Sequence, residues 1–88
     1  MWIKTVHEQT KYNRHIINNP PINLDFVLTF DKSTYKIYPD NDGLPSIKFY
    51  TVNYNGLSSS NVCICAEWVF EDEEKRNKEY LRLLTYIL

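Results

Sequence analysis

The sequence predicts an α+β fold, an antiparallel β-meander of four to six strands with one C-terminal α-helix packed on one face. Two neighbouring patterns lead to this prediction. Residues 62–70 place apolar side chains at every second position, as a strand with one buried face does: Val62, Ile64, Ala66, Trp68 and Phe70. Residues 72–87 change to helical spacing, with one apolar stripe that continues to the last residue: Tyr80, Leu81, Leu84, Ile87 and Leu88. We expect the two apolar faces to be buried against each other.

Four further strands complete the predicted sheet, over residues 2–6, 22–31, 34–38 and 46–54. The clearest alternation is in 22–31, where five large side chains share one face: Ile22, Leu24, Phe26, Leu28 and Phe30. Asp31, Lys32 and Ser33 predict a short hairpin loop that leads into the return strand. Connections of hairpin size imply antiparallel neighbours, because a parallel pair needs a crossover of about a dozen residues or more.

The remaining segments are predicted as turns, loops and a helix start. Residues 9–11 predict an irregular turn before a short extended piece at 15–17, and Pro20 and Pro21 end that piece. Asp72 is predicted to cap the helix, with acidic residues beside the positive end of the helix dipole. The acidic run 71–74 therefore requires no ligand to explain it.

Length and composition predict a single domain of 88 residues, with 43% hydrophobic and 24% charged residues. A formal net charge of -1 provides no long-range field that would attract nucleic acid or a membrane surface. The sequence shows no signal peptide and no apolar run of the roughly 20 residues that a membrane span needs. We expect a cytoplasmic protein.

Cys63 and Cys65 are the first candidates for a metal site. In a regular strand both sulfurs lie on one face, too far apart for an unstrained disulfide. Together with His7 and His15 they would complete a Cys2His2 zinc set, but their spacing matches no common zinc finger. Cysteine is also a small apolar residue that often fills a core. The sequence therefore predicts no metal and no cofactor, with a small zinc-binding protein or enzyme as an alternative.

No catalytic arrangement is recognisable. His7 and His15 have no serine, cysteine or carboxylate in a known relation to them, and the glycine-rich phosphate loops are missing from the sequence. Asp40 and Asp42 resemble half of a calcium loop, but Thr51 stands where such a loop has its glutamate. These observations favour a protein that is not an enzyme.

Aromatic residues make up 15% of the chain, and several of its seven tyrosines are expected to stay partly exposed. Tyrosine is common at protein contacts because it joins a large rigid body to a polar tip, although it is also a good strand residue. The helix is apolar around more than half of its circumference over its last two turns. We therefore predict a protein-interaction module, self-associating as a homodimer, with an interaction surface of four residues: Tyr50, Tyr54, Leu83 and Tyr86.

The alternative is a nucleic-acid-associated accessory protein, in which exposed aromatics stack on bases beside five basic side chains: Lys4, Lys11, Arg14, Lys36 and Lys48. The near-neutral net charge argues against it.

Three short motifs carry a resemblance to a known class of proteins: Trp2-Ile3, Asn23-Leu24-Asp25, and the strand-to-helix passage 68–74. With these motifs the chain resembles small bacterial and phage proteins that combine an antiparallel sheet with an acidic-capped C-terminal helix. The resemblance implies the same α+β fold, and it implies no activity, cofactor or catalytic residue.

Overall fold

The computed structural model describes residues 1–12, 14–36, 43–55 and 59–87, and the side chains of residues 53–61 lie outside this description. The elements in chain order are β1 (Trp2–Ile3), β2 (Gln9–Tyr12), β3 (His15–Asn18), β4 (Ile22–Asn23), the 3-10 helix η1 (Leu24–Phe26), β5 (Thr29–Lys36), β6 (Gly43–Asn55), β7 (Ser59–Val69) and α1 (Glu73–Ile87).

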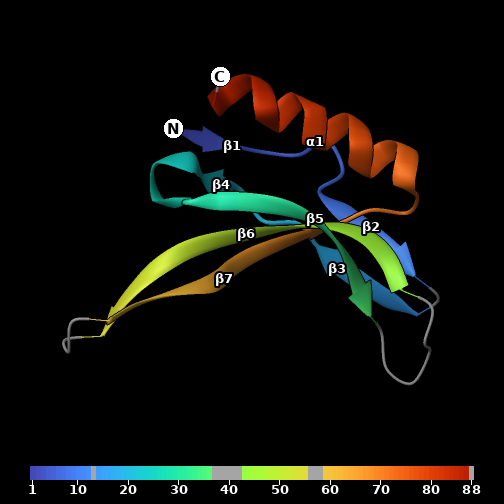
Figure 1. The fold of residues 1–88 in the computed structure, drawn as a ribbon. Helices are drawn as coiled ribbons and strands as arrows, with labels where there is room; N and C mark the ends of the chain where they lie inside the picture. The colour runs from blue at the N-terminus through green and yellow to red at the C-terminus, as the bar shows by residue number, and fades with distance from the viewer. Residues whose placement is uncertain (13, 37–42, 56–58, 88) are drawn as a thin grey trace.

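The α+β prediction is confirmed. Strands β5, β6 and β7 form an antiparallel meander, and two short antiparallel pairs, β1–β4 and β2–β3, accompany it. Helix α1 runs across one face of the meander and contacts β6 (Figure 1). The far ends of β6 and β7 project beyond the other elements, which gives the chain extents of 43 × 31 × 17 Å (Figure 1).

The predicted strand 22–31 is divided in the structure. The side chain of Asn23 accepts a hydrogen bond from the backbone N–H of Asp25, and this turn starts η1. The 3-10 turn breaks the alternation, so Phe26 is 72% exposed and Leu28 is 58% exposed instead of buried. The predicted hairpin loop at 31–33 is also wrong, because these residues form the middle of β5.

Residues 9–11 were predicted as an irregular turn, and they form strand β2, which pairs with β3. This hairpin is held to the end of β7 by buried polar contacts. Thr10 donates its hydroxyl to the carbonyl of Val69, and Asn19 both donates to that carbonyl and accepts from the Val69 N–H. These two side chains therefore satisfy the backbone N–H and carbonyl of Val69 where the hairpin meets the end of β7.

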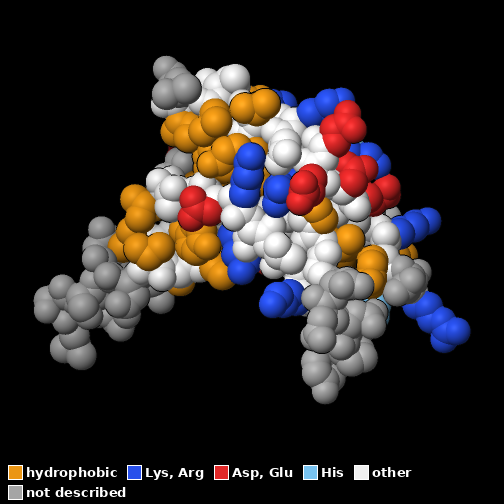
Figure 2. All heavy atoms as spheres, turned by 45° about the vertical axis from the view of Figure 1, so that its right-hand side comes forward, with side chains coloured by type: hydrophobic (Ala, Val, Ile, Leu, Met, Phe, Trp, Pro, Cys, Tyr) orange, Lys and Arg blue, Asp and Glu red, His pale blue; other side chains and the backbone are white. Residues whose placement is uncertain are grey.

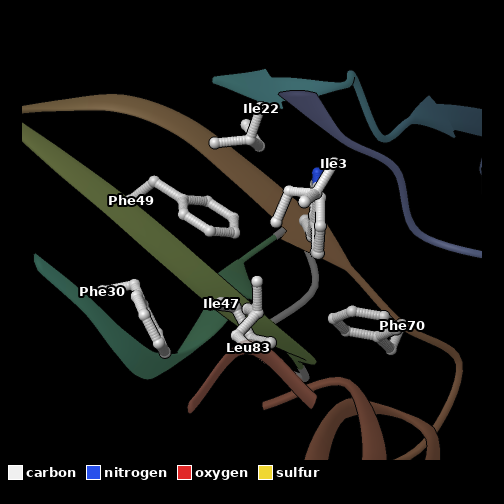
Figure 3. Close-up of a cluster of buried hydrophobic side chains, with 8 residues drawn as sticks. Ile3, Ile22, Phe30, Ile47, Phe49, Phe70 and Leu83 are labelled. Atoms are coloured by element: carbon white, nitrogen blue, oxygen red, sulfur yellow. The ribbon is translucent and has the colours of Figure 1, made fainter. Parts of the chain in front are cut away.

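The hydrophobic core lies between the meander, α1 and the β1–β4 pair. Figure 3 shows Leu83 of α1 directed at Ile47 of β6, with aromatic rings on either side. The cluster contains eight buried side chains, which are Ile3, Ile22, Phe30, Ile47, Phe49, Trp68, Phe70 and Leu83. The Phe49 and Trp68 rings meet edge to face with centroids 4.9 Å apart, a preferred arrangement of aromatic pairs.

Asp72 caps α1 as predicted, because its carboxylate accepts the backbone N–H of Lys75 at 2.8 Å. The predicted apolar stripe of the helix is confirmed for Tyr80 and Leu84, which pack against the core, and is wrong for Leu81 and Ile87, while Leu88 lies outside the described residues. Leu81 and Ile87 are each 64% exposed, whereas Leu83 is 0% exposed. The buried face also includes Glu79, and a glutamate at that position hides the true stripe from a hydrophobicity pattern.

Glu79 joins the helix to the segment that follows β1. Its carboxylate accepts hydrogen bonds from the Thr5 hydroxyl, the Val6 N–H and the Arg82 guanidinium. Arg82 in turn donates to the Lys4 carbonyl at 2.7 Å. A buried carboxylate that accepts from three donors stabilises the fold only while it is ionised, and its removal leaves those donors without an acceptor.

We expect Glu79 to make stability depend on pH in the acid range. Burial raises the pKa of Glu79, but the hydrogen bonds from Arg82 and Thr5 more than offset this, so its pKa lies below the ordinary range. The stabilisation is complete above about pH 4.3, the ordinary glutamate pKa, and is lost as pH falls through the folded value. Urea unfolding between pH 7 and pH 3 should show a smaller acid loss in Glu79→Gln than in the native chain. Equal slopes would contradict this assignment.

Candidate interaction surface

A β-bulge at Cys65 divides the β6–β7 pair into two parts. Phe49 is paired with Ala66, and the next residue of β6, Tyr50, is paired with Ile64. Cys65 is thus left without a partner across the pair. Because neighbouring residues of β6 point to opposite faces, Ala66 and Ile64 also lie on opposite faces of the sheet. Beyond the bulge, the even-numbered side chains of β7 therefore point to the face opposite to the one that Ala66 and Trp68 occupy.

The bulge corrects the predicted apolar face of residues 62–70. Trp68 pairs with Ile47 on the face that contacts α1, as predicted. Ile64 and Val62, in contrast, pair with Tyr50 and with Val52 on the other face. Only the part of β7 next to the helix therefore contributes to the core.

The part of β6 and β7 beyond the bulge is called the arm here, and its surface away from α1 is called the arm face. The arm face consists of four described side chains: Tyr50, Val52, Val62 and Ile64. Val62 is 56% exposed and Ile64 is 52% exposed, and the two residues of β6 are half-buried. These side chains form two directly opposite cross-strand pairs, so the apolar atoms are contiguous.

A row of charged side chains borders the arm face on the side toward the body of the molecule. Asp31, Lys48 and Glu67 are register partners across β5, β6 and β7. They alternate in sign, so their fields partly cancel. An apolar centre with a mixed polar rim is the usual anatomy of a protein interface.

A second apolar region lies on the helix side of the arm and is called the end groove. It contains a pocket of about 310 Å³ whose lining includes Trp2, Phe26 and Ala66. A second pocket of about 320 Å³ has Leu28 and Thr51 in its lining. Figure 2 shows hydrophobic side chains gathered toward the end where the helix finishes and the arm begins, while acidic side chains concentrate over the other half of the helix.

The structure does not bring together the three predicted interaction residues whose side chains it describes, Tyr50, Leu83 and Tyr86. Tyr50 lies on the arm face, whereas Tyr86 is exposed at the end of α1 on the other side of the sheet, beside Leu28 and Phe30. Leu83 is a correction, because it is fully buried in the core and cannot meet a partner. The side chain of Tyr54 lies outside the described residues, although its backbone belongs to β6.

The structure also adds residues that the sequence pattern did not indicate. Val62 and Ile64 were assigned to the core, and the bulge that exposes them has no signature in the alternation of residue types. For Phe26 a signal existed, since Asn23 and Asp25 are residues that favour turns over strand interiors.

The candidate zinc ligands are not assembled in the described part of the chain, where no three histidine, cysteine or acidic side chains gather closely enough to hold a metal. His7 packs against the edge of the Phe70 ring, with centroids 5.7 Å apart, and His15 pairs with Tyr12 in the β2–β3 hairpin. Both cysteines are free thiols, and the Cys65 thiol donates to the carbonyl of Phe49 at 3.5 Å.

We expect the thiol of Cys65 to react slowly. Burial raises the pKa of the Cys65 thiol, so less thiolate is present at a given pH. In a Cys63→Ser variant, alkylation by iodoacetamide at pH 8 should be slower in the folded protein than in urea, as followed by mass spectrometry. Equal rates in the two states would contradict the prediction.

Comparisons with protein-family models, with curated proteins and with solved structures give no match for this chain. Within the described residues, α1 is too short and too polar to cross a membrane.

Proposed function

We propose that the chain is a non-enzymatic, cytoplasmic protein-interaction module that associates through the apolar surfaces of its arm, with self-association as the expected form. The observation that carries the proposal is the gathering of exposed large apolar side chains at one end of the molecule. Four of them, Phe26, Leu28, Val62 and Ile64, are each more than half exposed. Contiguous exposed apolar surface on a small protein is characteristic of interaction sites.

The shape of this end supports the same proposal. The arm offers apolar side chains on both of its faces, with the end groove on the helix side and the arm face on the other. A strand pair that projects from the body is accessible to a partner from either side (Figure 1). Leaving these side chains in water forgoes roughly 1.5 to 3 kcal/mol for each large side chain that a partner would bury.

The nucleic-acid alternative draws less support from the positions of the basic residues. Lys48 stands between Asp31 and Glu67 across the sheet, which weakens its attraction for a phosphate. Lys11 lies in β2 and Lys36 ends β5. Lys11 therefore belongs to the β2–β3 pair, whereas Lys36 and Lys48 belong to the three-stranded sheet, so the basic residues do not form one group.

Affinity capture from a lysate of the source cell tests the proposed function. The native chain is compared with Phe26→Lys and Ile64→Lys, each with and without nuclease and at low and high salt. Ile16→Lys is the matched control, because Ile16 is a strand isoleucine that is 58% exposed on the β2–β3 hairpin. We expect a stoichiometric protein, or a second copy of the chain, to survive nuclease and salt and to be lost from at least one of Phe26→Lys and Ile64→Lys but not from the control.

The opposite pattern would overturn the proposal. Phosphate contacts weaken steeply as salt rises, whereas apolar contacts do not. Recovery that disappears with nuclease or with salt, and that is unaffected by Phe26→Lys and Ile64→Lys, would therefore favour the nucleic-acid alternative.

A further inference from the structure

We infer that Cys63 and Cys65 form a two-coordinate binding site for a soft monovalent metal ion, copper(I). The two ligands flank Ile64 in β7, and the site lies on the helix side of the arm, beside the end groove. Neither thiol is buried, so an ion can reach both sulfurs from solvent. This inference goes beyond the proposed function and does not require it.

The register of the strands places both thiols on the helix side of the sheet. Phe49 is buried in the core, and Thr51, two residues along β6, points to the same face. Cys63 is the register partner of Thr51, so its side chain shares that face. Cys65 is the extra residue of the bulge, and it lines the pocket of the end groove together with Thr51 and Ala66. The two thiols therefore share one face, while the residue between them belongs to the arm face.

The spacing of the two cysteines suits a bridging ion better than a disulfide. Alternate residues of a regular strand have Cα atoms about 6.6 Å apart, near the upper limit of about 6.8 Å for a disulfide, whose sulfurs must approach to about 2.05 Å. A metal ion between two thiolates holds the sulfurs roughly 4.6 Å apart, twice a metal–sulfur bond of about 2.3 Å. The Cys65 thiol donates a weak hydrogen bond to the Phe49 carbonyl at 3.5 Å, so an ion that replaces its proton displaces little.

The type and number of the ligands favour copper(I). Thiolates are soft ligands that select copper(I), zinc and iron–sulfur clusters. Structural zinc sites and iron–sulfur clusters use four protein ligands, and no third histidine, cysteine or acidic side chain joins the two thiols within the described residues. Copper(I) is satisfied by two thiolates in a linear arrangement. Burial raises the pKa of the Cys65 thiol and a charge on Cys63 raises it further, and a cation between the two sulfurs removes that repulsion.

The test is an anaerobic titration of the fully reduced chain with copper(I), supplied as its acetonitrile complex, in competition with a chromophoric copper(I) chelator. We expect one copper per chain, with two sulfur neighbours in X-ray absorption. Cys63→Ser and Cys65→Ser should each weaken binding about 100-fold or more, because the second thiolate acts at a high effective concentration. His7→Ala and His15→Ala should leave the affinity unchanged, and excess zinc should not displace the copper.

A matched variant moves one thiol to the other face of the arm. Cys63→Ser combined with Ile64→Cys keeps two cysteines, but the side chain at position 64 points to the arm face. This double variant should bind copper(I) as weakly as Cys63→Ser alone, while circular dichroism shows the fold of the native chain. Native affinity in the double variant or in either serine variant would overturn the site. Displacement of the copper by zinc, or a copper-dependent dimer in sedimentation velocity, would overturn it as well.

Discussion

Glu79→Ala is expected to lower the free energy of unfolding by about 3 kcal/mol, measured by urea unfolding at pH 7. The substitution removes an acceptor that binds the Thr5 hydroxyl, the Val6 N–H and Arg82. Thr5 is itself buried, so its hydroxyl loses a partner where water cannot easily replace it. Arg82 is left as a partly buried cation whose remaining contacts include the Lys4 carbonyl.

The matched control for this prediction is Glu74→Ala on the same helix. Glu74 makes an exposed ion pair with Lys78 at 3.5 Å, and such pairs contribute about 0 to 1 kcal/mol. The difference in the free energy of unfolding between the two variants therefore gives the contribution of the buried carboxylate without that of helix propensity. If both variants lost the same small amount, Glu79 would be no more than a surface residue of the helix.

The sequence predicted the parts of this fold in which local pattern and tertiary structure agree. Residues 46–54 alternate regularly and form most of β6, and Asp72 starts the helix as a capping residue should. The C-terminal helix on an antiparallel meander follows from these parts and from hairpin-sized connections.

The prediction failed where one tertiary contact outweighs a local pattern. The alternation of β7 continues in the sequence through Cys65, but the register shift there turns Ile64 from the core to the surface. Glu79 is charged, so a hydrophobicity pattern predicts that it is exposed. It is buried because Thr5, which is distant in the sequence, donates a hydrogen bond to its carboxylate. A single sequence contains no local signal for either partner.

The candidate site was predictable only in part for the same reason. Tyr50 was chosen as an amphipathic strand residue, and it lies on the arm face. Val62 and Ile64 were missed because an apolar strand residue is normally buried, and only the bulge reverses that expectation. The interaction surface is thus a consequence of the register of β6 and β7 and not of an unusual composition.

Asn19→Ala is expected to be the most destabilising single substitution among the polar residues, with a loss of about 4 kcal/mol in the free energy of unfolding. The Asn19 amide donates to the carbonyls of His7 and Val69 at 2.6 and 2.9 Å and accepts from the Val69 N–H at 2.8 Å. Asn19 is itself buried, so alanine leaves backbone groups without partners away from water. A chain of 88 residues typically has about 4 to 13 kcal/mol of stability in total.

Two further variants show whether the loss comes from these hydrogen bonds. Asn18→Ala removes only an exposed bond with Gln9 and should change stability by less than about 0.5 kcal/mol. Asn19→Asp keeps the acceptor for the Val69 N–H but places a carboxylate against two carbonyl oxygens, so it should be no more stable than Asn19→Ala. Native-like stability of Asn19→Asp would show that the amide donors contribute little. Because these donors hold the β2–β3 hairpin to the end of β7, that result would also require another explanation for why the hairpin packs there and leaves the arm face open.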